Sequence, residues 1–261
     1  MVILDTAFDF IDLQISSLYI YGRYNKYSRE IPQTRWFCKI CRGKGCRKCN
    51  YTGEIYKTSV EELVSKPFLV ASKGTDEAFH GAGREDIDVR MLGTGRPFVL
   101  ELKNPKIRNI NLSDMKDSVN SKNKDKISIQ NLAFCSKDEI ARIKAGEFKK
   151  TYKIVFKGES AINIEKLKKV LSSLRGTKIG QKTPSRVAHR RADLVRQKQI
   201  YDYTIESVEG TIATITLEAE SGTYIKELVS GDDNRTNPNI SKLLGIPCIV
   251  TELDVMHIKG E

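Results

Sequence analysis

Four cysteines within twelve residues constrain the fold of this chain more than any other feature of its sequence. They are Cys38, Cys41, Cys46 and Cys49. Two CxxC pairs supply four thiolates, the set that a tetrahedral Zn²⁺ takes, and the glycines between the pairs permit the tight turn that lets them converge. We therefore predict a zinc knuckle at residues 36–53. Its zinc has a structural role because no coordination position stays open, and iron–sulfur or redox use is the alternative.

The other two cysteines, Cys135 and Cys248, lie in apolar runs and are predicted to be buried thiols rather than ligands. The chain contains no apolar window long enough for a membrane helix, and its N-terminus carries acids where a signal peptide needs bases. We therefore expect a cytoplasmic protein. Disulfides are rare in the cytoplasm, which favours a metal site for the cysteine cluster.

The positive charge of the chain is concentrated in two segments. Its formal net charge is +11, and residues 21–49 hold nine Lys and Arg against one Glu. Residues 175–198 hold eight Lys and Arg against one Asp. Two separate basic segments indicate contact surfaces for phosphates, so we predict a polyanionic partner.

The hydrophobic pattern predicts an α+β fold on a mixed or antiparallel sheet. Alternating or apolar runs predict strands at 67–72, 87–92, 97–103, 127–135, 151–156, 211–219 and 247–256. Amphipathic runs predict helices at 137–145, 163–174 and 239–245, and a short helix capped by Thr58 or Ser59 that ends before Pro67. Residues 104–126 are predicted to be irregular, residues 192–201 helix-like and residues 222–228 strand-like. We expect an N-terminal segment at 1–66 and a catalytic domain at 67–261.

In the segment FHGAGREDIDVRMLGTGRPF, a carboxylate follows a turn formed by glycines. Asp86 would lie at the start of a strand, between arginines that keep it ionised, where it could act as nucleophile or base. Asp88 is its rival on the same strand face, and an ordinary β-turn with a surface ion pair is the alternative. No histidine lies in a metal-like or triad-like arrangement.

Two further segments, QKTPSRVAHRR at 181–191 and GTYIKELVSGDDNRTNPN at 222–239, complete a pattern. The first predicts a protruding loop that holds a sugar–phosphate backbone. On its own, Lys226 in the second would be a solvated side chain. With GRYNKYSREIPQTRW upstream, the segments resemble the tRNA pseudouridine synthase family called Pus Ten, across most of residues 17–256. The GRxD tetrad also resembles the catalytic turn of other pseudouridine synthases, and GTYIK resembles their GTYIR.

The resemblance implies a pseudouridine synthase fold and a catalytic site. Asp86 fills the D of GRxD and would be the catalytic aspartate, with Lys226 in the place of an arginine that keeps it anionic. Tyr152 would stack on the flipped uracil, and Leu228 would pack beneath the ring. RNA contacts are expected from seven residues: Arg84, Lys182, Arg186, His189, Arg190, Arg191 and Tyr224. No organic cofactor is implied.

The implied substrate is tRNA, at uridines 54 and 55 of the TΨC arm. Fuller members of the family carry a large N-terminal RNA-binding domain, and the matched region here opens shortly before GRYNKYSR. Either a separate RNA-binding subunit supplies that domain or the chain, otherwise a monomer, binds RNA by itself. The competing hypothesis is a non-enzymatic zinc-containing RNA-binding protein. That hypothesis explains the charge and the cysteines but leaves the GRED turn and GTYIK unexplained.

Overall fold

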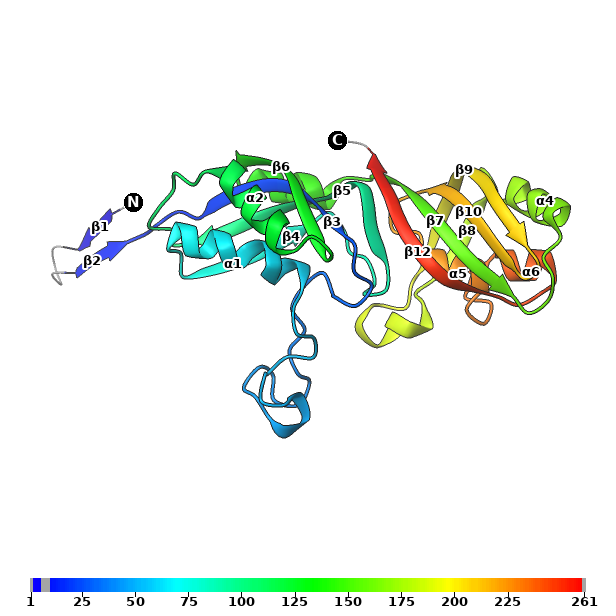
Figure 1. The fold of residues 1–261 in the computed structure, drawn as a ribbon, viewed down its shortest axis with the longest axis horizontal. Coiled ribbons are helices and arrows are strands. Elements are labelled where there is room, and N and C mark those ends of the chain that lie inside the picture. The colour runs from blue at the N-terminus through cyan, green and yellow to red at the C-terminus, as the bar shows by residue number, and fades with distance from the viewer. Residues whose placement is uncertain (1, 6–9, 260–261) are drawn as a thin grey trace. The chain divides into compact units, whose positions relative to one another are not determined.

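A computed structural model describes residues 2–5 and 10–259 and divides the chain into two compact units. Unit 1 comprises the residues up to Ile87 together with Gly95–Gly146. Unit 2 comprises Asp88–Thr94 and the residues from Glu147 on. The strand β5 (Arg90–Lys103) therefore begins in unit 2 and continues in unit 1 (Figure 1).

Unit 1 contains two groups of paired strands and several helices. The strands β1 (Val2–Asp5) and β2 (Phe10–Leu13) form a separate two-stranded sheet. The other strands of this unit are β3 (Leu18–Lys26), β4 (Asp76–Gly81), the later part of β5, and β6 (Ile127–Cys135). Its helices are η1 (Arg47–Cys49), α1 (Val60–Ser72), α2 (Leu112–Lys122) and α3 (Asp138–Ala145). The strand β3 lies between β5 and β6, and β4 pairs with β5. Tyr24, Phe98 and Phe68 of α1 are fully or almost fully buried and belong to the core.

Unit 2 contains a second sheet with three α-helices (Figure 1). Its strands run in the order β11 (Thr236–Asn237), β8 (Lys178–Lys182), β9 (Val195–Glu209), β10 (Ile212–Ala219), β7 (Lys149–Gly158) and β12 (Cys248–Lys259). Its helices are α4 (Ile164–Leu174), η2 (Ser185–Arg190), α5 (Ile225–Ser230) and α6 (Ile240–Leu244). The start of β5 pairs with β12 in parallel, whereas the other pairs are antiparallel, so the sheet is mixed as predicted.

The best-predicted elements are those whose own residues show which face is buried. Alternate residues of β10 are buried, from Ala213 to Ala219, as a strand with one face on a core requires. In α4 the buried residues recur at helical spacing, and Asn163 caps the helix by accepting the N–H of Lys166. The predicted α+β class is confirmed. Within the described residues, no helix has both the length and the apolarity to cross a membrane.

Five local predictions differ from the structure. Residues 67–72 continue α1 through Pro67, since Val64 and Phe68 bury one helix face. Residues 112–122 form α2, and β9 replaces the expected helix at 195–201 because β8 and β10 pair with it on both sides. Residues 225–230 form α5 rather than a strand. The strands predicted at 87–92 and 97–103 are one strand, β5.

Candidate active site and cysteine knuckle

Long polar side chains of unit 1 donate hydrogen bonds to the backbone of the GRED turn. Gly83 adopts a φ of 80°, which glycine accepts without strain, and its carbonyl accepts a hydrogen bond from Gln33 at 3.0 Å. The buried amine of Lys26 donates to the carbonyls of Asp86, at 3.3 Å, and Ile87, at 2.6 Å. The backbone of the turn is therefore bonded to the protein interior rather than left to water.

Glu85, the residue between the motif arginine and Asp86, is the buried acid of this turn. Its carboxylate forms an ion pair with Arg96 at 2.8 Å, and both side chains are at most 2% exposed. The hydroxyl of Tyr24 donates to it at 2.9 Å. Burial, followed by the charge of Glu85, raises the pKa of Tyr24 well above its usual value. Sequence reasoning missed this network because its members come from three separate segments.

Asp88 and Lys226 form one of the exposed charge pairs of unit 2. The amine of Lys226 donates to both carboxylate oxygens, at 2.9 and 2.7 Å. The side chain of Asp88 is 61% exposed and that of Lys226 is 25% exposed, so a bound molecule can reach the carboxylate. Burial raises the pKa of Asp88, but the hydrogen bond and charge of Lys226, together with the charge of Arg186, hold it below its usual value.

Within unit 2, the carboxylate that the structure gives to the amine of Lys226 is Asp88. Asp86 is half-buried and belongs to unit 1, where its carbonyl is bonded by Lys26, so the expected pairing of Asp86 with Lys226 stays a prediction. Ile87 and Asp88 form a turn before β5 begins at Arg90. The two acids therefore do not alternate along one strand face, as the sequence suggested.

The helix α5 presents Lys226 because a distant side chain caps it. Gln181 of β8 accepts the N–H of Tyr224 at 2.8 Å and donates to its carbonyl at 2.9 Å, just before the helix begins. Leu228 of the same helix is completely buried. Tyr152 is 7% exposed on β7, where it lies opposite Leu217 of β10.

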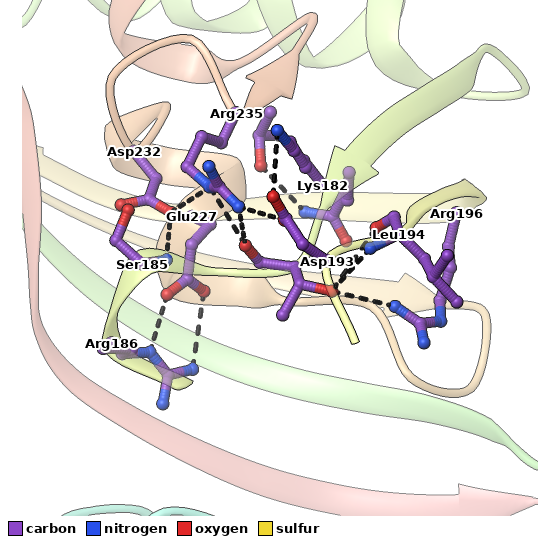
Figure 2. Close-up of polar contacts among 12 residues, drawn as sticks. Lys182, Ser185, Arg186, Asp193, Leu194, Arg196, Glu227, Asp232 and Arg235 are labelled. Atoms are coloured by element: carbon purple, nitrogen blue, oxygen red, sulfur yellow. Dashed lines mark hydrogen bonds and ion pairs between the residues drawn. The ribbon is translucent and has the colours of Figure 1, made fainter. Parts of the chain in front are cut away.

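Ion pairs to acids and hydrogen bonds to backbone carbonyls hold the basic loop between β8 and β9 (Figure 2). Asp193 accepts ion pairs from Lys182, at 3.0 Å, and from Arg235, which also donates to the carbonyl of Thr183 at 2.7 Å. Arg186 is bonded to Glu227 of α5. Two of the residues expected to bind phosphate are thus already paired with acids of the same unit.

The remaining predicted RNA contacts lie in different places. Arg191 is exposed and donates to the hydroxyl of Tyr224 at 3.2 Å. Arg84 belongs to unit 1, where its guanidinium lies 5.7 Å from the ring centre of Trp36 and donates to Thr34. The side chains of His189 and Arg190 lie outside the described part of the structure.

The four knuckle cysteines converge as their spacing predicts, and their ligand atoms all lie within 4.8 Å of one another. The Sγ atoms of Cys46 and Cys49 are 3.7 Å apart, as are those of Cys41 and Cys49. A tetrahedron with Zn–S bonds of about 2.3 Å has sulfur atoms about 3.8 Å apart, so the spacing fits such an ion and exceeds a disulfide bond. This cluster can bind a metal ion.

Backbone amides further favour thiolates in the knuckle. The N–H groups of Cys46 and Gly53 donate to the sulfur of Cys49 at 3.2 and 3.3 Å. Burial raises the pKa of Cys49, but these amides and the neighbouring cysteines outweigh it and lower the pKa to about 6. Cys248 is buried and Cys135 half-buried, and neither joins a metal-binding group among the described residues.

The charge pair and the basic loop together indicate a protein that acts on a polyanion. An exposed carboxylate that an ammonium keeps charged, in the same unit as an arginine-rich loop, suits chemistry on a polyanion. The sequence profile of the family "Pus10, C-terminal" matches residues 19–259. The chain belongs to this family.

Relatives in several archaea support the assignment. The chain is 50% identical over 95% of its length to the tRNA pseudouridine synthase Pus10 of Methanocaldococcus jannaschii, covering 54% of that protein. It is 44% identical over 96% of its length to the Methanothrix thermoacetophila protein of the same name, covering 55% of it. The chain thus spans about half the length of these relatives. Among solved structures, a Cbf5-Nop10-Gar1 complex gives a TM-score of 0.48 at 16% identity, covering 76% of this chain and 45% of that chain.

Proposed function

We propose that this chain carries the catalytic domain of a tRNA pseudouridine synthase that isomerises uridines 54 and 55 of the TΨC arm. The names of its relatives support the reaction class and the substrate. The observation that carries the proposal is the GRED turn, because Lys26 bonds its backbone and Glu85 pairs with Arg96, so the carboxylate of Asp86 is presented from a fixed backbone. The choice of uridines 54 and 55 follows the family resemblance.

We assign the catalytic role to Asp86, which fills the D of GRxD, and keep Asp88 as the alternative. The carbonyl of Asp86 is bonded by Lys26, so the backbone that carries its carboxylate is held in place. Asp88 is the more exposed acid, and it accepts two hydrogen bonds from the lysine of GTYIK. Direct substitution of both residues is the test.

The proposed reaction breaks the bond between N1 of uracil and C1′ of ribose, turns the base and joins C5 to C1′. The carboxylate of Asp86 either attacks C1′ and is released at the end, or removes the C2′ proton and returns it. C5 loses its proton and N1, freed from C1′, gains one, so the product is an isomer and no cofactor is consumed. Tyr152 and Leu228 are proposed to form the apolar wall of the uracil site, which fits their burial.

The amine of Lys226 is proposed to keep the catalytic carboxylate charged, as the family resemblance implies. Lys226→Met should therefore lower the single-turnover rate at saturating tRNA by about tenfold or more, because it removes this charge. Lys226→Arg keeps the charge and should keep most of the rate. Equal single-turnover rates in all three proteins would remove Lys226 from the chemistry.

The basic loop is proposed to bind the RNA backbone, and Arg191 is its best exposed candidate. Each phosphate contact changes the slope of log affinity against log salt by nearly one. Arg191→Ala should therefore weaken tRNA binding and make the slope shallower by about one. Binding curves at several salt concentrations measure it. Lys168→Ala, which removes an exposed cation from α4, is the control and should leave the slope unchanged.

Tritium release from tRNA labelled at C5 of uridine tests the function itself, because C5 loses its hydrogen only on isomerisation. The competing function, RNA binding without catalysis, predicts tight tRNA binding and no release. We further propose that the knuckle metal is zinc, since four thiolates at tetrahedral spacing are the set that zinc takes. The expected cytoplasmic location, the monomeric state, the separate RNA-binding subunit and the domain boundary at 66/67 stay predictions.

A further inference from the structure

A groove of about 690 Å³ crosses the edge of the unit 2 sheet, where β8 lies between β9 and β11. Its floor includes Lys178, Gly180 and Lys182 of β8, which share one face of that strand. Gln197 of β9 and Asn237 of β11 also line the groove, and they lie opposite Gly180 on its two sides. The floor is therefore a glycine between two amides along one direction and between two lysines along the other.

Neither backbone conformation nor packing requires a glycine at position 180. The φ of Gly180 is not positive, so other residues could adopt its conformation. A Cβ here would lie 3.6 Å from the carbonyl oxygen of Asn237 and 3.7 Å from Nε2 of Gln197, which are ordinary van der Waals distances. Glycine weakens the interior of a strand and is found there at bulges, at bends and where a ligand approaches closely. The pairing of β8 with β9 continues through Gly180 without a shift, which leaves close approach of a bound molecule as its explanation.

The charges around the groove favour an anion. Lys178 and Lys182 belong to its floor. Arg235 lines its wall together with one acid, Asp233. Lys182 and Arg235 are partly neutralised because both pair with Asp193, as Figure 2 shows. Lys178 is exposed, and within the described part of the chain no acid forms an ion pair with it. Lys178 is therefore the cation that can exchange its counterions for a phosphate.

The groove lies on the face of β8 opposite to the helix α5. Gln181, the residue before Lys182, is completely buried and accepts the N–H of Tyr224 at the start of that helix. Successive side chains of a strand point to opposite faces, so Lys178 and Lys182 point away from the helix that carries Lys226. The groove is thus separate from the residues of α5 that the proposed reaction uses.

We propose that this groove binds a stretch of the tRNA sugar–phosphate backbone away from the reacting uridine. The backbone crosses β8 at Gly180, where no side chain keeps it from the strand, and places a phosphate on Lys178. The amides of Gln197 and Asn237 can donate to phosphate oxygens and exchange hydrogen bonds with 2′-hydroxyls. Both amide side chains are exposed, and an open groove suits a strand that continues on either side, whereas a small molecule needs enclosure. The inference rests on the proposed function, which supplies tRNA as the substrate.

Lys178→Ala and Gly180→Val test the groove by two independent changes. Lys178→Ala removes one phosphate contact, so the slope of log tRNA affinity against log salt should become shallower by about one. Gly180→Val adds a residue that strands favour and changes no charge, so the protein should fold. Its side chain fills the floor, so tRNA should bind more weakly and lose the same contact, again with a slope shallower by about one. The double variant should bind no more weakly than Gly180→Val alone, because the lysine contact is already lost.

Two matched controls change the same sheet outside the groove. Lys157→Ala removes an exposed lysine from β7, and Ser207→Val adds the same branched side chain at an exposed position of β9. Both should keep the wild-type affinity and salt slope, measured by binding of a tRNA transcript at several salt concentrations. Thermal unfolding establishes that each variant is folded.

A wild-type salt slope in Lys178→Ala would overturn the inference, and so would wild-type affinity in folded Gly180→Val. Equal losses of affinity in the two controls would also contradict it. Because Lys178 is exposed, its variant tests the groove even where Gly180→Val does not fold. A wild-type protein that binds tRNA but releases no tritium contradicts the proposed function alone, so the two failures are distinguishable.

Discussion

Replacement of Asp86 by asparagine should reduce pseudouridine formation by at least about 10³-fold, because an amide can neither attack C1′ nor accept a proton. The affinity for tRNA should change little, since the proposed phosphate contacts lie in the basic loop. Asparagine has nearly the size and shape of aspartate, so the protein should fold normally. Tritium release under single-turnover conditions, with a parallel binding assay, measures both quantities.

Asp88→Asn is the matched substitution, two residues away in the same turn. We expect it to retain most of the activity, because Asp86 fills the D of GRxD. If Asp88→Asn is inactive and Asp86→Asn is active, the ion pair with Lys226 identifies the catalytic residue better than the position in GRxD does. Loss of tRNA binding in Asp86→Asn would instead show that this acid supports the RNA site.

The double substitution Cys38→Ser with Cys41→Ser should abolish metal binding, because two of the four thiolates are lost. The wild-type protein should hold one zinc ion per chain, and the variant less than about one tenth of that. Metal content by elemental analysis of the purified proteins checks this. Cys135→Ser, which removes a thiol that belongs to no metal-binding group of the described chain, should keep its zinc.

The same variant tests whether the metal is structural. Four cysteine thiolates would fill all four positions of a tetrahedral metal ion and leave none for substrate. The variant should therefore keep part of the single-turnover rate at saturating tRNA. A folded variant with no residual rate at any tRNA concentration would contradict a structural role. Zinc present in the variant at the wild-type level would place the metal at other ligands.

The convergence of the four cysteines could be predicted from sequence because they lie within twelve residues. The pair of Asp88 and Lys226 could not, because the two residues are 138 positions apart and only the fold brings them together. The pairing of Arg186 with Glu227 was missed for the same reason, since a loop arginine looks free until its partner is placed.

The fold shows a similar division between local and distant causes. The strands β7 and β10 and the helix α4 were predicted because their own residues alternate or recur at helical spacing. The helix α5 was taken for a strand because its cap is Gln181, a side chain from another strand. The helix α2 has a local cap, Asn111, which accepts the N–H groups of Ser113 and Asp114 and could have been recognised from the sequence.

The buried contact of Glu85 with Arg96 limits how the GRED tetrapeptide can be transferred to other scaffolds. A designer who grafts these four residues alone would introduce a carboxylate whose counter-charge and hydroxyl donor stay behind in the parent protein. An unpaired buried charge costs about 3–5 kcal/mol, enough to unfold many small domains. The smallest portable version of this turn therefore includes Tyr24 on β3 and Arg96 on β5, which makes it a property of a folded unit rather than of a peptide.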